Sequence, residues 1–198
     1  MAAAYAAIAN DGVYIQPTFY AKIVDFDGNV VREASQETRK VLSSAASYVV
    51  KELLTEPVKN GTATQCTISE MSVAAKTGTT TNDYDRWLCG FTPYYTAATW
   101  FGYDKNETVK FPGLNPASLI WIEIMRPLHS SLDPQTFAQN MPDTVITQRT
   151  CKSSGLLATS RCGSRIYTEF FVIGTEPTKY CNYHTNTGGA PNGVQITF

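Results

Sequence analysis

Four consecutive residues combine groups that could hold a small acid: Lys76, Thr77, Gly78 and Thr79. The lysine offers a fixed cation, and the two threonines offer hydroxyls that can donate to a carboxylate. Glycine has no side chain, so an extended peptide can lie close to the strand backbone at that point. Together these groups suit a peptide that ends in a carboxylate, or a small molecule that mimics one.

A K-T-G run alone is also an ordinary strand end that leads into a turn, so its surroundings decide between the two interpretations. Three runs with the composition of strands, 72–78, 85–93 and 95–104, follow one another closely. Residues 79–83 and the corner at Pro93 join them, and such short connections are typical of an antiparallel meander. The sequence therefore places the K-T-G run on the first strand of a three-stranded unit.

Further elements are predicted on both sides of this unit. Residues 1–10 are rich in alanine and form a short helix that stops at Asn-Asp-Gly. Two strand-like runs follow, and Asp27-Gly28 between them is a strong hairpin-turn dipeptide. Residues 59–66 are expected to form a loop.

Two longer helices are predicted, over 43–58 and 115–132. Pro57 should end the first, whereas Asn115 can cap the second and Pro116 suits its first turn. Each helix carries an apolar stripe that should face the core. The residues of these stripes are Val49, Val50, Leu53, Leu54, Ile120, Ile124 and Leu128.

The composition is that of a globular protein, with 198 residues, 43% hydrophobic and 17% charged. A net charge of −1 gives no basic face for nucleic acid or for a membrane. No apolar run approaches the ~20 residues of a spanning helix, and the first residues lack the basic region of a signal peptide. We expect one domain over 1–130 and a polar, turn-rich extension over 131–198, which contains one strand over 166–177 and ends in a tail.

The five cysteines are Cys66, Cys89, Cys151, Cys162 and Cys181. The first two are predicted to be buried free thiols. The last three cluster in the turn-rich extension, which predicts a disulfide among them in an extracytoplasmic protein. No C-x-x-C pair occurs and neither His129 nor His184 completes a zinc-like spacing, so no metal and no cofactor are predicted.

The stretch "VAAKTGTTTNDYDRWLCGFTP" and the aromatic strand after it resemble the penicillin-binding proteins, the D,D-transpeptidases that cross-link bacterial cell walls. Other segments agree in order and spacing. Residues 1–31 resemble the family segment before its K-T-G strand, and 118–129 its last long helix. Residues 151–162 and 168–184 are similar to the C-terminal extension of bifunctional members. The resemblance implies the C-terminal half of an α+β transpeptidase fold, whose five-stranded sheet takes two strands from the start of the domain.

The resemblance also implies roles for single residues. Lys76 would place positive charge near the substrate carboxylate and tune proton transfer, and the hydroxyls of Thr77 and Thr79 would contact that carboxylate. The backbone N–H of Thr79 would form half of an oxyanion hole, and Gly78 would keep the strand edge open. Asp83, Asp85 and Trp87 would be structural.

The nucleophile of the family is missing from this sequence. Family chemistry needs a serine in S-x-x-K and a second motif, S-x-N. No lysine here has a serine three places before it, and no asparagine has one two places before it. We therefore expect a C-terminal part of a longer enzyme, inactive alone, whose nucleophile, glycosyltransferase domain and membrane anchor lie upstream. Its partners would be stem peptides or β-lactams and the missing part of the domain.

Two other functions compete with this one. The chain could be a non-catalytic module that binds peptidoglycan peptides or a partner along the K-T-G strand. It could also be a hydrolase of another design, with Cys89 or Cys151 as nucleophile and His129 or His184 as base. Nothing in the spacing of these residues supports the hydrolase.

Overall fold

The computed structural model describes residues 1–184, which form a mixed α+β structure. The chain divides into two compact units that meet in sequence at Pro142 and Asp143. The first unit extends past the predicted boundary at residue 130 because Phe137, in the short 3-10 helix Phe137–Asn140, packs on buried Ala74 and Phe91. Within the described residues no helix is long and apolar enough to cross a membrane.

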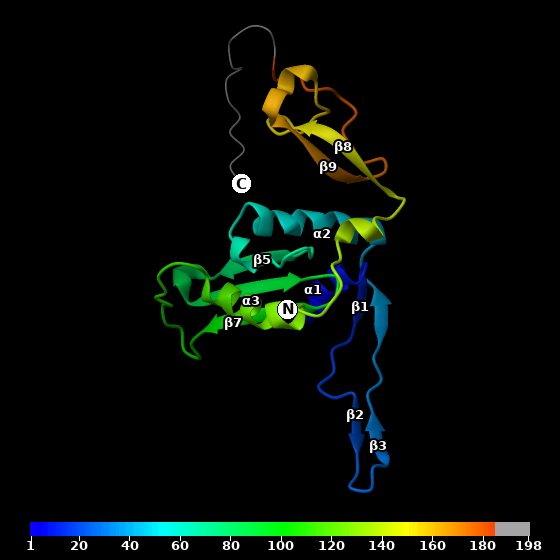
Figure 1. The fold of residues 1–198 in the computed structure, drawn as a ribbon, viewed down its shortest axis with the longest axis vertical. Coiled ribbons are helices and arrows are strands. Elements are labelled where there is room, and N and C mark those ends of the chain that lie inside the picture. The colour runs from blue at the N-terminus through cyan, green and yellow to red at the C-terminus, as the bar shows by residue number, and fades with distance from the viewer. Residues whose placement is uncertain (185–198) are drawn as a thin grey trace. The chain divides into compact units, whose positions relative to one another are not determined.

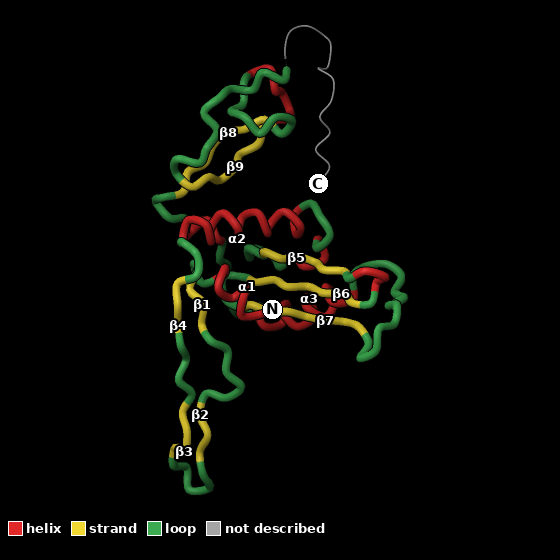
Figure 2. Tube along the Cα trace, turned by 180° about the vertical axis from the view of Figure 1, so that it is seen from behind, coloured by secondary structure: helices red, strands yellow, loops and turns green. Residues whose placement is uncertain are grey.

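The centre of the first unit is a three-stranded antiparallel sheet in the order β5-β6-β7. Its strands are β5 (Ala74–Thr79), β6 (Asp85–Phe91) and β7 (Thr96–Gly102). Lys76 lies opposite Cys89, and Trp87 lies opposite Trp100. The predicted meander is confirmed, and its three strands run side by side in Figures 1 and 2.

Three helices accompany this sheet: α1 (Ala2–Ala9), α2 (Ser44–Lys59) and α3 (Pro116–Leu128). The Asn115 side chain accepts from the Ala117 N–H at 3.0 Å, so the predicted cap of α3 is confirmed. The Ser43 hydroxyl caps α2 by accepting from Ala46. Pro57 does not stop α2, which continues to Lys59. Short 3-10 helices also occur at Thr64–Cys66 and Thr81–Asp83.

The predicted core face of α3 is wrong, and that of α2 is only partly right, because Leu54 packs on the core and Leu53 does not. Leu53 is 56% exposed and Ile124 is 50% exposed. The side chains that α3 buries against the sheet include Trp121 and Met125, which pack with Leu88. Helix α3 is apolar on more than one side, and the large Trp121 side chain removes more apolar area from water than an isoleucine does. Aromatic packing therefore determines which stripe faces the sheet.

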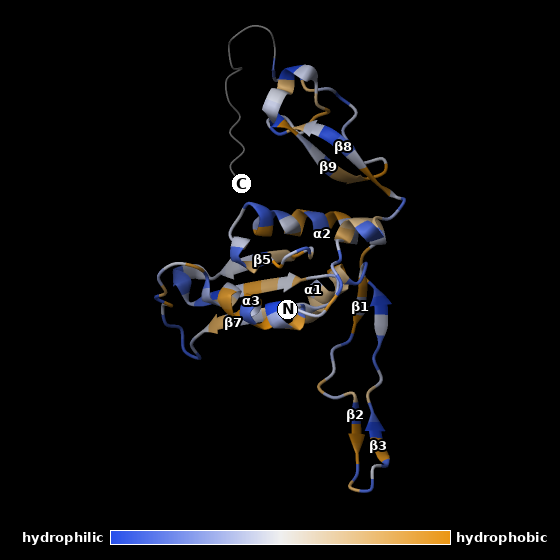
Figure 3. Cartoon of the chain, in the orientation of Figure 1, coloured by the Kyte–Doolittle hydropathy of each residue, from blue (hydrophilic) through white to orange (hydrophobic). Residues whose placement is uncertain are grey.

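Residues 13–40 form a narrow two-stranded arm (Figure 2). Strand β1 (Val13–Ile15) pairs with β4 (Thr38–Lys40), and β2 (Lys22–Val24) pairs with β3 (Val30–Glu33). The predicted turn lies between β2 and β3, where Gly28 has a φ of +85°. Strand β2 is hydrophobic in Figure 3, although it is exposed.

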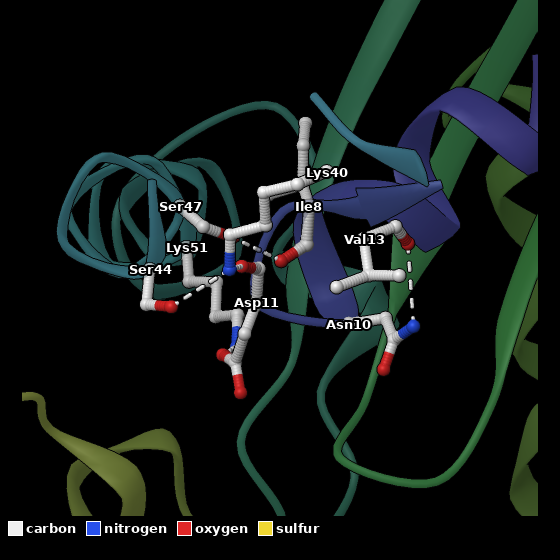
Figure 4. A network of polar contacts seen from close by, with 8 residues as sticks. All are labelled: Ile8, Asn10, Asp11, Val13, Lys40, Ser44, Ser47 and Lys51. Carbon is white, nitrogen blue, oxygen red and sulfur yellow. Dashed lines mark hydrogen bonds and ion pairs between the residues drawn. The ribbon is translucent and has the colours of Figure 1, made fainter. Parts of the chain in front are cut away.

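A polar network joins the end of α1 to α2 and β4 (Figure 4). The Lys51 ammonium is buried and lies 2.5 Å from Asp11 Oδ1, whose side chain is half exposed. Lys40 Nζ donates to the Asp11 carbonyl at 2.8 Å and to Ser44 Oγ at 2.9 Å. Ser47 Oγ donates to the Ile8 carbonyl. The network fixes α1 against α2, and hence the start of the chain beside the sheet.

We expect Asp11→Asn to lower the free energy of unfolding by about 2 kcal/mol, because it leaves the buried Lys51 ammonium without its carboxylate. Asparagine tolerates the positive φ of residue 11, so backbone strain does not contribute. Lys51→Met removes the buried charge itself and should cost less. Urea unfolding of both variants measures the difference. A larger loss for Lys51→Met than for Asp11→Asn would contradict this view of the network.

The second unit contains β8 (Val145–Cys151), the 3-10 helix Ser160–Arg165 and β9 (Ile166–Val172). Strand β9 was predicted, whereas β8 lies in a region predicted to be turn-rich and without a strand. Pairing with β9 along its whole length makes β8 a strand despite its polar composition. Residues 185–198 of the predicted tail lie outside the described residues.

The disulfide predicted among the last three cysteines is not formed. All five cysteines are buried free thiols, so the prediction for Cys66 and Cys89 is confirmed and the one for the extension is wrong. The three sulfurs of the extension instead share their surroundings with an imidazole.

Candidate functional site

The K-T-G run occupies an edge strand. Lys76, Thr77, Gly78 and Thr79 form the last four residues of β5, and β6 pairs with one side of them. Within residues 1–184 no strand pairs with the other side of β5. A strand in this position offers backbone groups to an extended ligand.

The hydrogen bonds of the two hairpins reveal which backbone groups face the unpaired edge. Thr80 N–H donates to the Asp85 carbonyl at 3.2 Å, and Thr92 N–H donates to the Tyr95 carbonyl at 2.9 Å. Successive residues of an antiparallel strand direct their backbone N–H and C=O groups alternately toward one neighbour and away from it. Counting back from either bond gives the same direction for each residue of β5. Lys76 and Gly78 bond toward β6, whereas the N–H groups of Thr77 and Thr79 point away from it.

The Lys76 ammonium also lies at the unpaired edge of β5. Its ammonium donates to the Thr77 carbonyl at 3.0 Å, and this carbonyl is one that points away from β6. Lys76 is exposed, and no ion pair to it occurs in the described part of the chain. The positive charge is therefore held beside the outward amides and is available to an anion.

A pocket of about 390 Å³ lies beside Lys76 and Gly78. It is lined by residues of α1, β5 and β6 and by the first residue: Met1, Tyr5, Lys76, Thr77, Gly78, Thr79, Thr80, Trp87 and Cys89. Burial raises the pKa of the Cys89 thiol. The pocket thus combines apolar side chains with the Lys76 ammonium at its edge.

The hydroxyls of Thr77 and Thr79 belong to the opposite face of β5, because side chains alternate along a strand. Thr77 Oγ1 shares a hydrogen bond of 2.8 Å with Thr62 Oγ1, and Arg86 donates to Thr79 Oγ1 at 3.1 Å. Arg86 also pairs with Asp83 at 3.1 Å. A second pocket, of about 330 Å³, has both threonines of β5 in its lining, together with Thr62 and Arg86.

Sequence reasoning did not single out Thr62 or Arg86. Arg86 is a second cation at the end of β5, and it lies opposite Thr79 in the register. That register follows from the predicted hairpin once its turn is fixed, so the signal was present in the sequence. Thr62 lies in the predicted loop 59–66, whose approach to β5 depends on tertiary packing.

Glycine at position 78 is favoured for two reasons: it leaves the strand edge open to a ligand, as expected, and it leaves room for the Trp87 side chain. A Cβ atom at this position would lie 3.2 Å from the Cβ of Trp87, closer than ordinary van der Waals contact. Trp87 lies opposite Gly78 and lines the same pocket. Any larger residue at position 78 would therefore displace Trp87 or occupy the pocket.

The polar residues of the β5–β6 turn make contacts within the turn and the sheet. Asp85 accepts from the Trp100 indole N–H at 2.7 Å and from the Thr80 hydroxyl at 2.8 Å. Asp83 pairs with Arg86. These bonds hold the turn that follows the K-T-G run.

His129 is held by two hydrogen bonds inside the first unit. Its Nδ1 donates to the Met125 carbonyl at 2.7 Å, so its Nε2 accepts from the Thr92 hydroxyl at 2.8 Å. The ring is 5% exposed. With both nitrogens engaged and Cys89 favoured as a neutral thiol, these two residues do not make a nucleophile and base.

Comparison with known proteins identifies the class. The model of the penicillin-binding protein transpeptidase domain matches residues 1–126, and the model of the penicillin-binding protein 1A C-terminal domain matches residues 141–186. The chain therefore belongs to the penicillin-binding protein family. It contains part of the transpeptidase domain together with a C-terminal domain of the 1A type.

Individual relatives agree with these matches. Penicillin-binding protein 1A of Clostridium perfringens is 39% identical over 192 residues, which cover 94% of this chain and 23% of the relative. The chain thus spans less than a quarter of that relative's length. A crystal structure of penicillin-binding protein 1A from Haemophilus influenzae covers 90% of this chain and 32% of its own, with a TM-score of 0.76 and 21% identity, which supports the fold. The imipenem acyl-enzyme of penicillin-binding protein A from M. tuberculosis covers 64% of this chain and 30% of its own, with a TM-score of 0.53 and 21% identity.

Proposed function

We propose that this chain supplies one wall of the catalytic cleft of a peptidoglycan D,D-transpeptidase, an enzyme that cross-links cell-wall stem peptides by acyl transfer. The observation that carries the proposal is the edge of β5. There the N–H groups of Thr77 and Thr79 point away from β6, beside the Lys76 ammonium. A cation and two free amides in a row suit an extended peptide with a carboxylate end.

The proposed chemistry assigns each group a part in acyl transfer. The stem peptide lies along β5, and a serine from a longer protein attacks its carbonyl carbon. The N–H of Thr79 stabilises the negative charge that develops on the carbonyl oxygen, and Lys76 attracts the carboxylate and favours loss of the serine proton. The C–N bond then breaks, and the terminal amino acid leaves as an amine that takes up a proton in place of the one lost by the serine. An acyl-enzyme remains for attack by an acceptor amine, whose proton returns to the serine oxygen as the ester bond breaks. A β-lactam would take the place of the stem peptide.

Because the nucleophile is missing here, we propose that this chain is part of a longer protein that contains it. The sequence contains neither S-x-x-K nor S-x-N. The longer protein would carry both motifs, act outside the cytoplasm and be held there by a membrane anchor. Genomic sequence next to the codon for Met1 tests this relation, because an adjoining reading frame with S-x-x-K is expected.

We expect that the 198-residue chain alone forms no stable covalent adduct with penicillin, since an activated serine is needed. Mass spectrometry after penicillin treatment measures the adduct, and the longer protein with S-x-x-K serves as the positive control. One added acyl mass on a serine of this chain would contradict the expectation. Stem-peptide binding by the chain, combined with no acylation of the longer protein, would instead favour a non-catalytic binding module.

A further inference from the structure

The second unit gathers four metal-ligating side chains at one point. The Sγ atoms of Cys151, Cys162 and Cys181 and a ring nitrogen of His184 all lie within 4.8 Å of one another. Cys151 and Cys162 are fully buried and Cys181 is 7% exposed. The Cys151 sulfur lies 3.3 Å from His184 Nε2. Sequence reasoning predicted no metal here because it required a familiar motif, although Cys181 and His184 are separated by only two residues.

Three separate segments bring these ligands together. Cys151 ends β8, and a tight turn follows in which Gly155 N–H donates to the Cys151 carbonyl at 2.8 Å. Cys162 lies in the 3-10 helix Ser160–Arg165. The backbone of Cys181 donates to the Leu157 carbonyl at 2.8 Å, which ties the last segment to the others.

The cysteines are themselves the centre of this unit's core. Among the described residues of this unit, the hydrophobic cluster consists of the three buried cysteines, with Leu156, Ala158 and Ile166 packed against it. Three small side chains bury little apolar area, and short turns with so little core need another source of stability. A metal ion bound by the cysteines would supply it.

We propose that Cys151, Cys162, Cys181 and His184 bind one zinc ion in a tetrahedral structural site. Zinc–sulfur bonds of ~2.3 Å and zinc–nitrogen bonds of ~2.0 Å place tetrahedral ligand atoms roughly 3.5–3.8 Å apart. The 3.3 Å between Cys151 Sγ and His184 Nε2, and the limit of 4.8 Å on all pairs, are compatible with this geometry. Four protein ligands leave no open position, so the ion stabilises the fold and does not act on a substrate. Three thiols lose their protons when the ion binds, and the imidazole binds in its neutral form.

Two other uses of these groups fit the geometry less well. A disulfide would join two of the three sulfurs and leave a buried thiol and an imidazole beside it with no function. A Cys151–His184 nucleophile and base would need access for a substrate, yet Cys151 is fully buried. A disulfide or a nucleophile and base would use only two of the four groups, whereas a metal ion would use all four.

Metal analysis of the whole 198-residue chain, purified with a non-chelating reductant, tests the proposal. We expect about one zinc ion per chain and, after exchange, a cobalt absorption spectrum typical of tetrahedral thiolate coordination. Cys162→Ser should lose the metal, whereas Cys89→Ser, a matched change of a buried cysteine in the other unit, should keep it. His184→Cys should keep the metal with a stronger sulfur-to-cobalt band, which shows that a variant at this position folds.

The contradicting results are equally specific. Less than about a fifth of a zinc ion per chain in the wild type, under conditions where Cys89→Ser and the wild type melt alike, would overturn the site. Zinc content that Cys162→Ser leaves unchanged would also overturn it, because the ion would then lie elsewhere. None of these results depends on transpeptidase activity, so this inference and the proposed function can fail separately.

Discussion

Lys76→Ala, introduced into the longer protein that contains S-x-x-K, should lower the rate constant for acylation by penicillin by about 10²–10³-fold. Lys76 holds its ammonium at the unpaired edge of β5, 3.0 Å from the Thr77 carbonyl. The opposite wall of a cleft would remove water from this charge, so its attraction for a carboxylate would exceed the ~0–1 kcal/mol of a surface pair. Stopped-flow or gel-based acylation measures the rate.

The fold should tolerate the change. Lys76 is exposed and makes no ion pair within residues 1–184, so its removal should change stability by no more than about 0.5 kcal/mol. Lys76→Arg keeps the charge but should also acylate slowly, because a planar guanidinium does not replace a compact ammonium in a tight site. Melting curves of both variants are the control. Near-normal acylation by Lys76→Ala would mean that Lys76 is only a surface residue.

Thr79→Pro in the same longer protein should lower the acylation rate by about 10²–10³-fold, the usual effect of losing one oxyanion-hole donor. Proline has no N–H, and the N–H of Thr79 points away from β6. The sheet therefore loses no hydrogen bond at this position, which is the edge position where proline is tolerated. The acylation rate is measured for Thr79→Pro and Thr79→Ala in parallel. The comparison distinguishes the contribution of the Thr79 N–H from that of the Thr79 hydroxyl.

Thr79→Ala is the matched control for this second variant. It keeps the N–H and loses the γ-methyl group and the hydroxyl, which here accepts from Arg86 at 3.1 Å. We expect a fall in rate of roughly tenfold or less, as for one hydrogen bond. Equal rates for the proline and alanine variants, with both folded, would show that the Thr79 N–H is not an oxyanion donor.

Local sequence signals were sufficient for the elements that carry the site. The Asn115 side chain and Pro116 predicted the start of α3, and Asp27-Gly28 predicted the hairpin of the arm. The meander followed from three strand-like runs with short connections. Each of these signals acts over a few residues, so no knowledge of the tertiary packing was needed.

Features that depend on distant contacts were not predictable in the same way. Helix α3 carries apolar residues on more than one side, and the position of Trp121 against the sheet determines the buried side. Strand β8 is polar and owes its conformation to β9. The cysteine and histidine cluster joins residues from 151 to 184, and spacing along the chain did not reveal that they converge.

A crystal structure of the longer protein acylated by penicillin would test the role of the β5 edge most decisively. We predict that the carbonyl oxygen of the acyl group lies about 3 Å from the backbone nitrogen of Thr79, at hydrogen-bond distance. The carboxylate should lie within reach of the Lys76 ammonium. An acyl group whose carbonyl oxygen and carboxylate both lie away from β5 would contradict the proposed function.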